Sequence, residues 1–306
     1  MKKLISVLIF SLGLMISKAQ TFNPLLSAML QDTFDYYVSV IPNIKGMQAS
    51  VQIPGQGIWT RTGGISYQGV PVTNDMQMGI ASNTKLFVST IMLKLAERNK
   101  IKLQDSIKKW ITITNPNINP NINIRQLLNH TSGISDPLFT SPWVDTIKAY
   151  PNRKFTNSEV LKWVGAPLFQ AGQGYGYSNI NYIIAGMIAE SSTGNTISQL
   201  IRDSILNPLG LTSTFYDVDE APNGVLAHRW WNGIDYHDTS RVGLNSAGGC
   251  AGAIFSNSAD MVKWYQSLFS GNIISKTSLN LMSNFIVTGT PNYQYGLGLS
   301  RETTQG

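Results

Sequence analysis

Apolar residues recur every three or four positions in several parts of the chain, which is the period of a helix that buries one face. In residues 23–40 this repeat includes Leu26 and Phe34. The same period predicts further helices at residues 82–99, 124–134, 158–165, 179–193, 196–206 and 258–269. We expect Gly194 to end the helix at 179–193, because glycine is common in the left-handed position after a helix. We expect Ser258 to cap the last helix.

Alternation of apolar and polar residues occurs first in residues 46–53 and 58–62. The Gly/Pro turn between these two segments predicts a β-hairpin. We interpret residues 63–75 as a loop and residues 282–300 as extended chain with a strand at 295–299. Strands on both sides of a helical middle predict an α+β fold, in which an antiparallel sheet is flanked by helices and an all-helical subdomain is inserted.

The first 19 residues have the pattern of a secretory signal segment. Two lysines precede an apolar core at 4–16, and the small residues Ser17 and Ala19 predict cleavage before Gln20. This core is shorter than the roughly 20 residues needed to span a bilayer, and no other stretch is long and apolar enough to do so. We therefore expect an exported protein, periplasmic or secreted, whose mature chain forms one domain at 20–306.

Composition is that of an ordinary globular protein, because 42% of the 306 residues are hydrophobic and 13% are charged. The formal charge of +6 falls to +3 when the three lysines of residues 1–19 are removed. No basic run remains, so nucleic-acid binding has no support. The single cysteine, Cys250, excludes an internal disulfide. Its small-residue neighbours indicate a packed, inert thiol.

The clearest chemical signal lies in residues 79–85 (GIASNTK), which lead into an apolar helix. Ser82 and Lys85 are three residues apart, so a helix places their side chains on one face. A serine becomes a nucleophile when a neighbouring base takes its proton, and a lysine in low-dielectric surroundings can be that base. The alternative is that Ser82 only caps the helix. That alternative leaves Lys85 unexplained, because the positive end of a helix disfavours lysine.

A second match to S-x-x-K at residues 106–109 shows that this motif is weak on its own. We interpret it as a chance match, because its context is a polar surface turn with two adjacent lysines. A Ser-His-Asp triad could be written with His130, His228 or His237. However, the sequence has no G-x-S-x-G elbow and no H-E-x-x-H or other metal-binding spacing. We therefore expect a structural role for His130.

Tyr177 and Asn179 are the predicted partners of the serine and lysine. Tyr177 lies between glycine-rich residues and a buried helix, so its ring can be held rigidly in a cleft. A nearby ammonium is expected to favour its phenolate form. Asn179 can donate to and accept from an amide substrate or Lys85. A plain turn followed by an Asn cap is the alternative, and the other Y-x-N match, at 150–152, is discounted because it lies in a charged loop.

In this combination and order, the motifs resemble those of the serine β-lactamase and penicillin-binding-protein superfamily. Ser82-x-x-Lys85 followed by Y-S-N at 177–179 is similar to the class C β-lactamase branch, which also holds DD-peptidases and esterases. Three other segments resemble motifs of this branch: L-L-N-H-T-S-G at 127–133, N-P-L-G-L at 207–211 and G-G…S…D-M at 248–261. The resemblance covers about residues 25–300.

The resemblance implies an exported serine hydrolase and a role for each residue. Ser82 would be acylated, Lys85 and Tyr177 would share general acid and base catalysis, and Asn179 would orient the substrate and Lys85. The backbone amide of Ser82 would supply half of an oxyanion hole. The implied partner is a small-molecule or peptidoglycan-peptide substrate with an amide, ester or β-lactam carbonyl. The resemblance implies no cofactor or metal, and the oligomeric state stays open.

The third motif of the family, K-T-G or H-x-G, follows a Y-G-L-G segment that corresponds to residues 295–298. The sequence ends at Gly306 without this motif, whose strand supplies the second oxyanion donor. We therefore expect a C-terminal truncation that removes the last strands of the sheet. If Gly306 is the natural end, the alternative is a non-catalytic ligand-binding or sensor protein on the same fold, or an inactive fragment.

Overall fold

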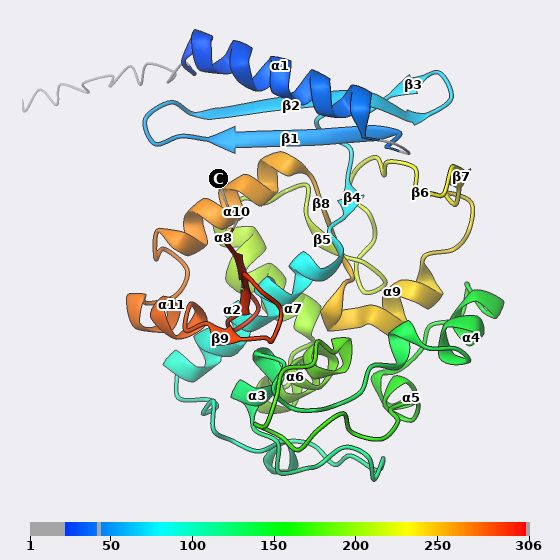
Figure 1. The fold of residues 1–306 in the computed structure, drawn as a ribbon, viewed down its shortest axis with the longest axis vertical. Helices are drawn as coiled ribbons and strands as arrows, with labels where there is room; N and C mark the ends of the chain where they lie inside the picture. The colour runs from blue at the N-terminus through cyan, green and yellow to red at the C-terminus, as the bar shows by residue number, and fades with distance from the viewer. Residues whose placement is uncertain (1–21, 42–43, 304–306) are drawn as a thin grey trace, which may run out of the picture.

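The computed structural model of the protein describes residues 22–41 and 44–303 (Figure 1). The predicted signal segment at 1–19 lies outside the described residues. Helices and small antiparallel sheets alternate in this structure, which confirms the predicted α+β class. Within the described residues, no helix combines the length and apolar character needed to cross a membrane.

A helix and a sheet form the outer layer of the molecule. Helix α1 (Pro24–Val40) lies across one face of the sheet β1–β2–β3, whose strands are Gly46–Gln52, Ile58–Tyr67 and Val70–Pro71 (Figure 1). The side chain of Asn23 caps α1 by accepting from Leu26 N at 3.1 Å. The β1–β2 hairpin was predicted from alternation, and the register pairs Val51 with Trp59.

Strand β2 is longer than the alternation predicted, and the interpretation of residues 63–75 as a loop is wrong for its first part. The glycine at position 63 is the reason why the pattern is broken. A Cβ on Gly63 would lie 2.8 Å from Cε1 of Phe34, so α1 can pack this closely on the strand only where no side chain intervenes. Packing of the helix, rather than a turn, explains the glycine.

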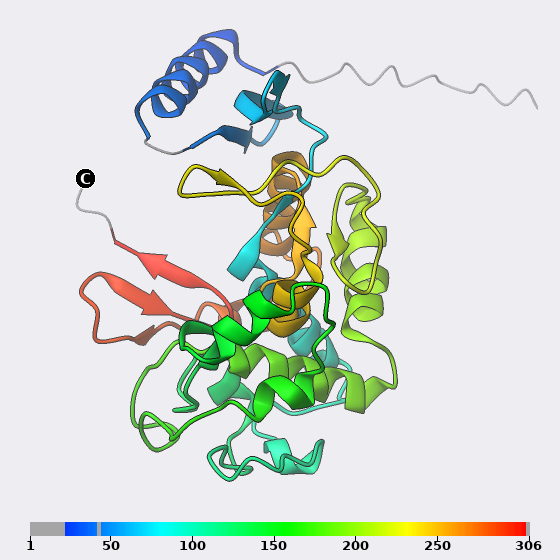
Figure 2. The same ribbon diagram turned by 90° about the vertical axis from the view of Figure 1, so that its right-hand side faces the viewer.

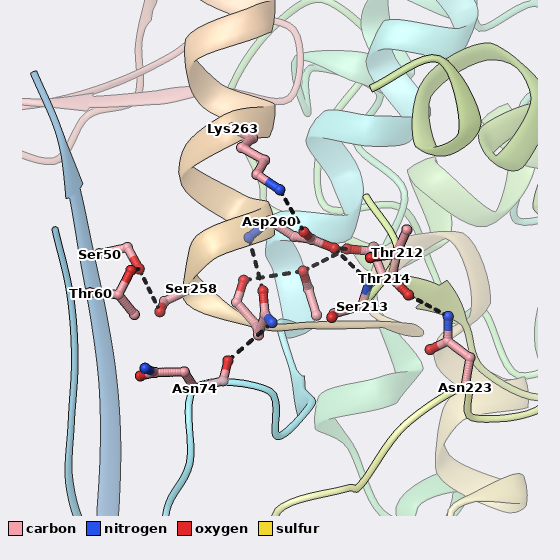
Figure 3. Close-up of polar contacts among 12 residues, drawn as sticks. Ser50, Thr60, Asn74, Thr212, Ser213, Thr214, Asn223, Ser258, Asp260 and Lys263 are labelled. Atoms are coloured by element: carbon pink, nitrogen blue, oxygen red, sulfur yellow. Dashed lines mark hydrogen bonds and ion pairs between the residues drawn. The ribbon is translucent and has the colours of Figure 1, made fainter. Parts of the chain in front are cut away.

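Helix α10 (Ser258–Phe269) lies against the other face of β1, as Figures 1 and 2 both show. Its limits agree with the prediction, but its cap is Asn257 rather than Ser258. The Asn257 side chain accepts from Asp260 N at 2.8 Å, whereas the Ser258 hydroxyl lies 2.8 Å from the hydroxyl of Ser50 in the hairpin (Figure 3). The side chain that accepts from the free amides at the start of α10 therefore belongs to Asn257, and the prediction that Ser258 caps this helix is wrong.

Asp260 connects α10 to the layer beneath. Its buried carboxylate accepts from Ser213 N at 2.8 Å and from Thr214 Oγ1 at 2.9 Å, and Lys263 Nζ lies 3.8 Å away (Figure 3). A buried carboxylate is stable only where hydrogen bonds replace water. This network fixes α10 on the short sheet β4–β8–β5, which comprises Met78–Gly79, Ile254–Ser256 and Phe215–Tyr216.

Two helices form the centre of the molecule. Helix α2 (Thr84–Glu97) is buried on nearly all faces and packs on α6 (Asn179–Thr193), as expected for helices this apolar. The prediction for α6 is confirmed at both ends, and Gly194 follows it in the left-handed conformation with φ +78°. The predicted helix at 196–206 is confirmed, and it consists of α7 (Ile197–Ile201) and a π-helical turn (Arg202–Leu206). It then continues beyond the predicted end as α8 (Asn207–Leu209).

The shorter elements agree less well with the prediction. Helices α3 (Ile124–Leu128) and α5 (Asn157–Leu161) are shorter than predicted, and three helices were not predicted: α4 (Trp143–Ala149), α9 (Val242–Gly248) and α11 (Lys276–Met282). Two short strands lie in the extended region predicted at 282–300, β9 (Ile286–Val287) and β10 (Tyr293–Tyr295), and a third, β11 (Ser300–Glu302), overlaps it only at Ser300. Residues 296–299 form a turn rather than the predicted strand, since Gly296 N donates to Leu299 O. In Figure 2 this small sheet projects from one side of the helical body.

Cys250 packs directly against Gly186 of α6 and is fully buried. Burial raises the pKa of its thiol to about 12, in agreement with the predicted inert thiol. A Cβ on Gly186 would lie 2.1 Å from the Cys250 sulfur, so Gly186→Ala is expected to destabilise the protein. The expected cost from urea unfolding is about 1–3 kcal/mol, which is typical of overpacking. The double variant Gly186→Ala/Cys250→Ala should recover most of that loss, and full additivity of the two changes would contradict this explanation.

Candidate active site

Ser82 lies at the junction between strand β4 and helix α2. It occupies the middle of a 3-10 turn (Ala81–Asn83), and its side chain is exposed. Ala81 adopts φ +46°, a strained conformation for a residue with a Cβ and one that recurs at functional sites. The alternative that Ser82 only caps α2 is wrong. The N-cap position of α2 belongs to Asn83, and no side chain caps that end.

Lys85 is the second residue of α2 and is 1% exposed. Its Nζ atom lies 3.1 Å from Ser82 Oγ, so the helical spacing brings the pair together as predicted. Nζ also donates to Asn179 Oδ1 at 2.7 Å and to the backbone oxygen of Ala251 at 2.8 Å. Burial lowers the pKa of Lys85 to about 7, while the carboxylate of Asp136 partly opposes that effect.

Tyr177 approaches Ser82 from the loop before α6. Its hydroxyl donates to Ser82 Oγ at 2.8 Å, and Lys85 Nζ lies 4.8 Å from the centre of its ring. Burial raises the pKa of Tyr177 to about 12, although the hydrogen bond to Ser82 acts in the opposite direction. The expectation that a nearby ammonium favours the phenolate is therefore wrong. Desolvation penalises the phenolate, and this effect is larger than any stabilisation from nearby groups.

Asp136 belongs to this cluster, and the sequence reasoning missed it. It caps a 3-10 turn (Pro137–Phe139), and its Oδ2 atom accepts from Asn179 N at 2.6 Å and from Asn179 Nδ2 at 2.8 Å. Because Nδ2 is held by Asp136, the Oδ1 atom of Asn179 must face Lys85. Burial raises the pKa of Asp136. An acidic residue just before a proline was a signal for a cap, but nothing in the pattern placed that cap beside α6.

The hydrogen bonds around Lys85 leave it free to act as a base toward Ser82. A neutral lysine amine has two N–H groups and one lone pair. Two acceptors, Asn179 Oδ1 and Ala251 O, occupy the two N–H groups, so the lone pair is left for the hydroxyl of Ser82. Ser82 Oγ accepts at the same time from Tyr177. The serine is thus placed between a base that can take its proton and a phenol that can return one.

The remaining candidates lie elsewhere. His228 and His237 stack on each other at 3.7 Å, and Asp235 pairs with His228, with neither ring bonded to Ser82. Within 22–41 and 44–303, no group of three or more His, Cys, Asp or Glu side chains could hold a metal ion. In the second S-x-x-K match, Lys109 pairs with Asp105 at the surface. Trp231 of the Trp230–Trp231 pair is 70% exposed, so it does not belong to the packed core.

Comparison with known sequences gives matches over most of the chain. A family model described as Beta-lactamase matches residues 34–306. Protein flp of Staphylococcus aureus (strain COL) is 33% identical over 141 residues, which are 45% of this chain and 27% of that protein. A putative D-alanyl-D-alanine carboxypeptidase of Escherichia coli (strain K12) is 27% identical over 269 residues, or 76% of this chain and 60% of that protein. The chain therefore spans less than two thirds of either relative.

Comparison with solved structures agrees with the sequence matches. A D-stereospecific amidohydrolase from Streptomyces sp. has a TM-score of 0.78 at 25% identity, with 91% of this chain and 84% of that chain covered. The D-amino acid amidase from Ochrobactrum anthropi SV3 complexed with D-phenylalanine has a TM-score of 0.80 at 25% identity, with coverage of 91% and 81%. A penicillin-binding protein from Bacillus halodurans shares the fold at 21% identity, with coverage of 85% and 81% and a TM-score of 0.70.

Proposed function

Because the chain belongs to the Beta-lactamase family, we propose that it is a serine hydrolase that forms an acyl-enzyme at Ser82. The observation that carries this proposal is the double contact of Ser82 Oγ, with Lys85 Nζ at 3.1 Å and with Tyr177 OH at 2.8 Å. A serine used only for packing or capping needs neither a buried lysine of lowered pKa nor a tyrosine beside it.

In the proposed acylation step, neutral Lys85 takes the proton of Ser82 while Oγ forms a bond to the substrate carbonyl carbon. The negative charge on the carbonyl oxygen is met by the backbone N–H of Ser82, since the first N–H groups of a helical turn have no partner within it. Tyr177 gives its proton to the leaving nitrogen or oxygen as the bond to that atom breaks. Water then replaces the leaving group, and the proton transfers run in reverse to release the acid.

The proposed substrates are amides of D-amino acids, including short peptides that contain them. The support is the likeness over 91% of the chain to two hydrolases whose names specify D-configured substrates, together with the carboxypeptidase relative. Turnover of D-phenylalanine amide, L-phenylalanine amide, a D-alanyl-D-alanine peptide, a simple ester and a chromogenic β-lactam should be compared. We expect a preference for the D-configured amides, and equal rates for D- and L-phenylalanine amide would contradict it.

A fluorophosphonate probe tests the hydrolase proposal independently of the substrate. We expect one covalent adduct per chain, located on Ser82 by mass spectrometry of peptides. Saturable, reversible binding of the substrates above without turnover and without this adduct would contradict the proposal. It would favour a ligand-binding or sensor role on the same fold.

The rate should depend on pH through two residues. Lys85 is a base only when neutral, so kcat/KM should rise with pH as the pH passes about 7. Tyr177 is an acid only when protonated, so the rate should fall again as the pH approaches about 12. Initial rates should be measured from pH 5 to the highest pH at which circular dichroism still shows the folded protein, and this range covers the rise in rate near pH 7.

The variant Asp136→Asn tests the assignment of that rise to Lys85. Because Asp136 raises the pKa of Lys85, the variant should show the rise at lower pH. A rise at an unchanged pH would exclude Lys85 as its source.

Export also remains a proposal, and its support is the signal-like pattern of residues 1–19. Expression of the full gene product in a Gram-negative host should place the protein outside the cytoplasm with Gln20 as its first residue. An intact Met1 terminus on protein recovered from the cytoplasm would contradict cleavage and export.

A further inference from the structure

His130 is a fully buried residue that follows helix α3 and directly adjoins the loop that carries Tyr177. We propose that His130 is a positioning residue, which holds the phenol of Tyr177 at Ser82 through hydrogen bonds to the residues on both sides of that tyrosine. This inference rests on the proposed function, because it assigns a source for the placement of the acid in that mechanism.

The contacts of His130 enclose Tyr177 on both sides. Gly176, the residue before Tyr177, donates its N–H to the backbone oxygen of His130 at 3.0 Å. Ser178, the residue after Tyr177, donates its N–H to His130 Nδ1 at 3.2 Å. The imidazole ring also lies against the Tyr177 ring, with centroids 4.4 Å apart. A single residue therefore fixes the backbone before and after the tyrosine and one face of its ring.

The conformation of His130 makes this double contact possible. Its φ of +60° is the left-handed region, which ends α3 earlier than the sequence pattern predicted. Histidine is among the few residues other than glycine that adopt this region with some frequency. The turn directs the backbone oxygen and the side chain of the same residue toward one loop, whereas continuation of the helix would direct the oxygen along the helix axis.

The hydrogen-bond partners determine which imidazole nitrogen carries the proton. A backbone N–H can only donate, so the contact from Ser178 requires His130 Nδ1 to be an acceptor. Asn181 must then present its Nδ2 group to the same nitrogen, at 3.0 Å. Its Oδ1 atom accepts from the hydroxyl of Ser132 at 2.6 Å, which agrees with this orientation. The single proton of the neutral ring is therefore on Nε2.

The surroundings keep this ring neutral. Nε2 has no hydrogen-bond partner within the described residues, and the rings of Tyr177, Tyr182 and Tyr295 surround the imidazole at centroid distances of 4.4–5.4 Å. Burial, and to a lesser degree the charge of Lys85, hold the pKa of His130 well below its usual value. An imidazolium would place an N–H against the N–H of Ser178. His130 therefore acts as a fixed acceptor rather than as a proton carrier in the reaction.

Three variants separate this role from simple loss of packing. Asn keeps an acceptor at the δ position and tolerates the left-handed backbone, so His130→Asn should acylate within a few-fold of wild type. His130→Leu lacks the acceptor and should lower the acylation rate by about 10- to 100-fold, as expected when a reacting group moves by about 1 Å. Asn99→Leu is the matched control, because Asn99 is exposed beyond α2 with φ +55°. It should acylate normally, which shows that the backbone strain of a left-handed leucine away from the site does not lower the rate by destabilising the protein as a whole.

A second measurement reads the position of Tyr177 without any reaction. In protein labelled with ¹³C at the tyrosine Cζ atoms, Tyr177→Phe identifies the signal of Tyr177. That signal should shift or broaden in His130→Leu and stay near its wild-type position in His130→Asn and Asn99→Leu. If wild type forms no acyl-enzyme but this pattern holds, the hydrolase proposal fails and the positioning role stands.

The proposal is overturned if His130→Leu acylates at the wild-type rate or leaves the Tyr177 signal unchanged. It is also overturned if Asn99→Leu loses as much activity as His130→Leu. If His130→Leu does not fold, the wild-type protein still decides the matter. Long-range ¹H–¹⁵N spectra of labelled histidine should show a neutral ring protonated at Nε2, and a proton on Nδ1 would exclude the hydrogen bond from Ser178.

Discussion

Replacing Ser82 with alanine should lower kcat/KM on any acyl substrate by about 10⁶-fold, the typical loss when a serine hydrolase loses its nucleophile. The change removes the oxygen atom that contacts both Lys85 Nζ and Tyr177 OH. Covalent labelling by the fluorophosphonate probe should disappear as well. Ser82 is exposed in a short turn and caps nothing, so we expect the melting temperature to stay within a few degrees of wild type.

The matched control for Ser82→Ala is Ser106→Ala, in the second S-x-x-K match of the same chain. The lysine of that second motif, Lys109, lies at the surface and pairs with Asp105. We expect Ser106→Ala to retain full labelling and full turnover. Residual labelling of Ser82→Ala at the wild-type rate, or loss of labelling in Ser106→Ala, would show that the nucleophile has been assigned to the wrong residue.

Removal of the base should be nearly as damaging as removal of the nucleophile. Lys85→Met keeps roughly the length of the side chain but replaces the amine with a thioether that cannot serve as the base. We therefore expect kcat/KM to fall by roughly 10⁴- to 10⁶-fold. Lys85→Arg should be inactive too, because a guanidinium stays charged and cannot accept the proton of Ser82. Initial rates and the rate of probe labelling measure both variants. Because serine and lysine act as a unit, the double variant Ser82→Ala/Lys85→Met should be no slower than Ser82→Ala alone.

Folding and function should separate in Lys85→Met. The substitution removes the desolvation cost of a buried amine, but it leaves Asn179 Oδ1 and Ala251 O without their donor. Each buried acceptor left unpaired costs about 1–3 kcal/mol, so the two effects oppose each other. We expect the free energy of unfolding to change by less than about 2 kcal/mol. A much larger loss of stability would mean that Lys85 is retained for packing, and activity data from this variant would then be uninterpretable.

The parts of the fold that could be predicted from sequence are those in which one periodicity runs for many residues. Helix α6 was predicted at both ends, because its apolar repeat is long and Gly194 follows it. The predicted strand ended before Gly63, whereas β2 continues through it. The glycine is there because the side chain of Phe34, from helix α1, packs against it. No local pattern contains that contact. Short helices such as α4 were missed for the same reason, since they depend on tertiary packing more than on their own propensity.

In the site, too, features set by local spacing could be predicted and features set by tertiary contacts could not. Spacing alone placed Ser82 and Lys85 together, because the 3-10 turn that holds Ser82 continues directly into α2 and residues three apart then share a face. It could not give the protonation state of Tyr177, which depends on burial by residues far apart in the sequence. Asp136 was missed because its two bonds to Asn179 connect a loop to a helix 43 positions away. The expected C-terminal truncation and the roles of the site residues stay predictions.

The buried Cys250 makes this protein convenient for site-specific spectroscopy. The folded chain hides its one thiol and suppresses thiolate formation, so maleimide reagents should find no target in the native state. A cysteine introduced at an exposed position, such as Trp231→Cys on the β6–β7 hairpin (Trp230–Trp231 and Ile234–Asp235), would then be the sole labelling point. A fluorophore or spin label attached there would report on this hairpin alone, with no background cysteine to remove first.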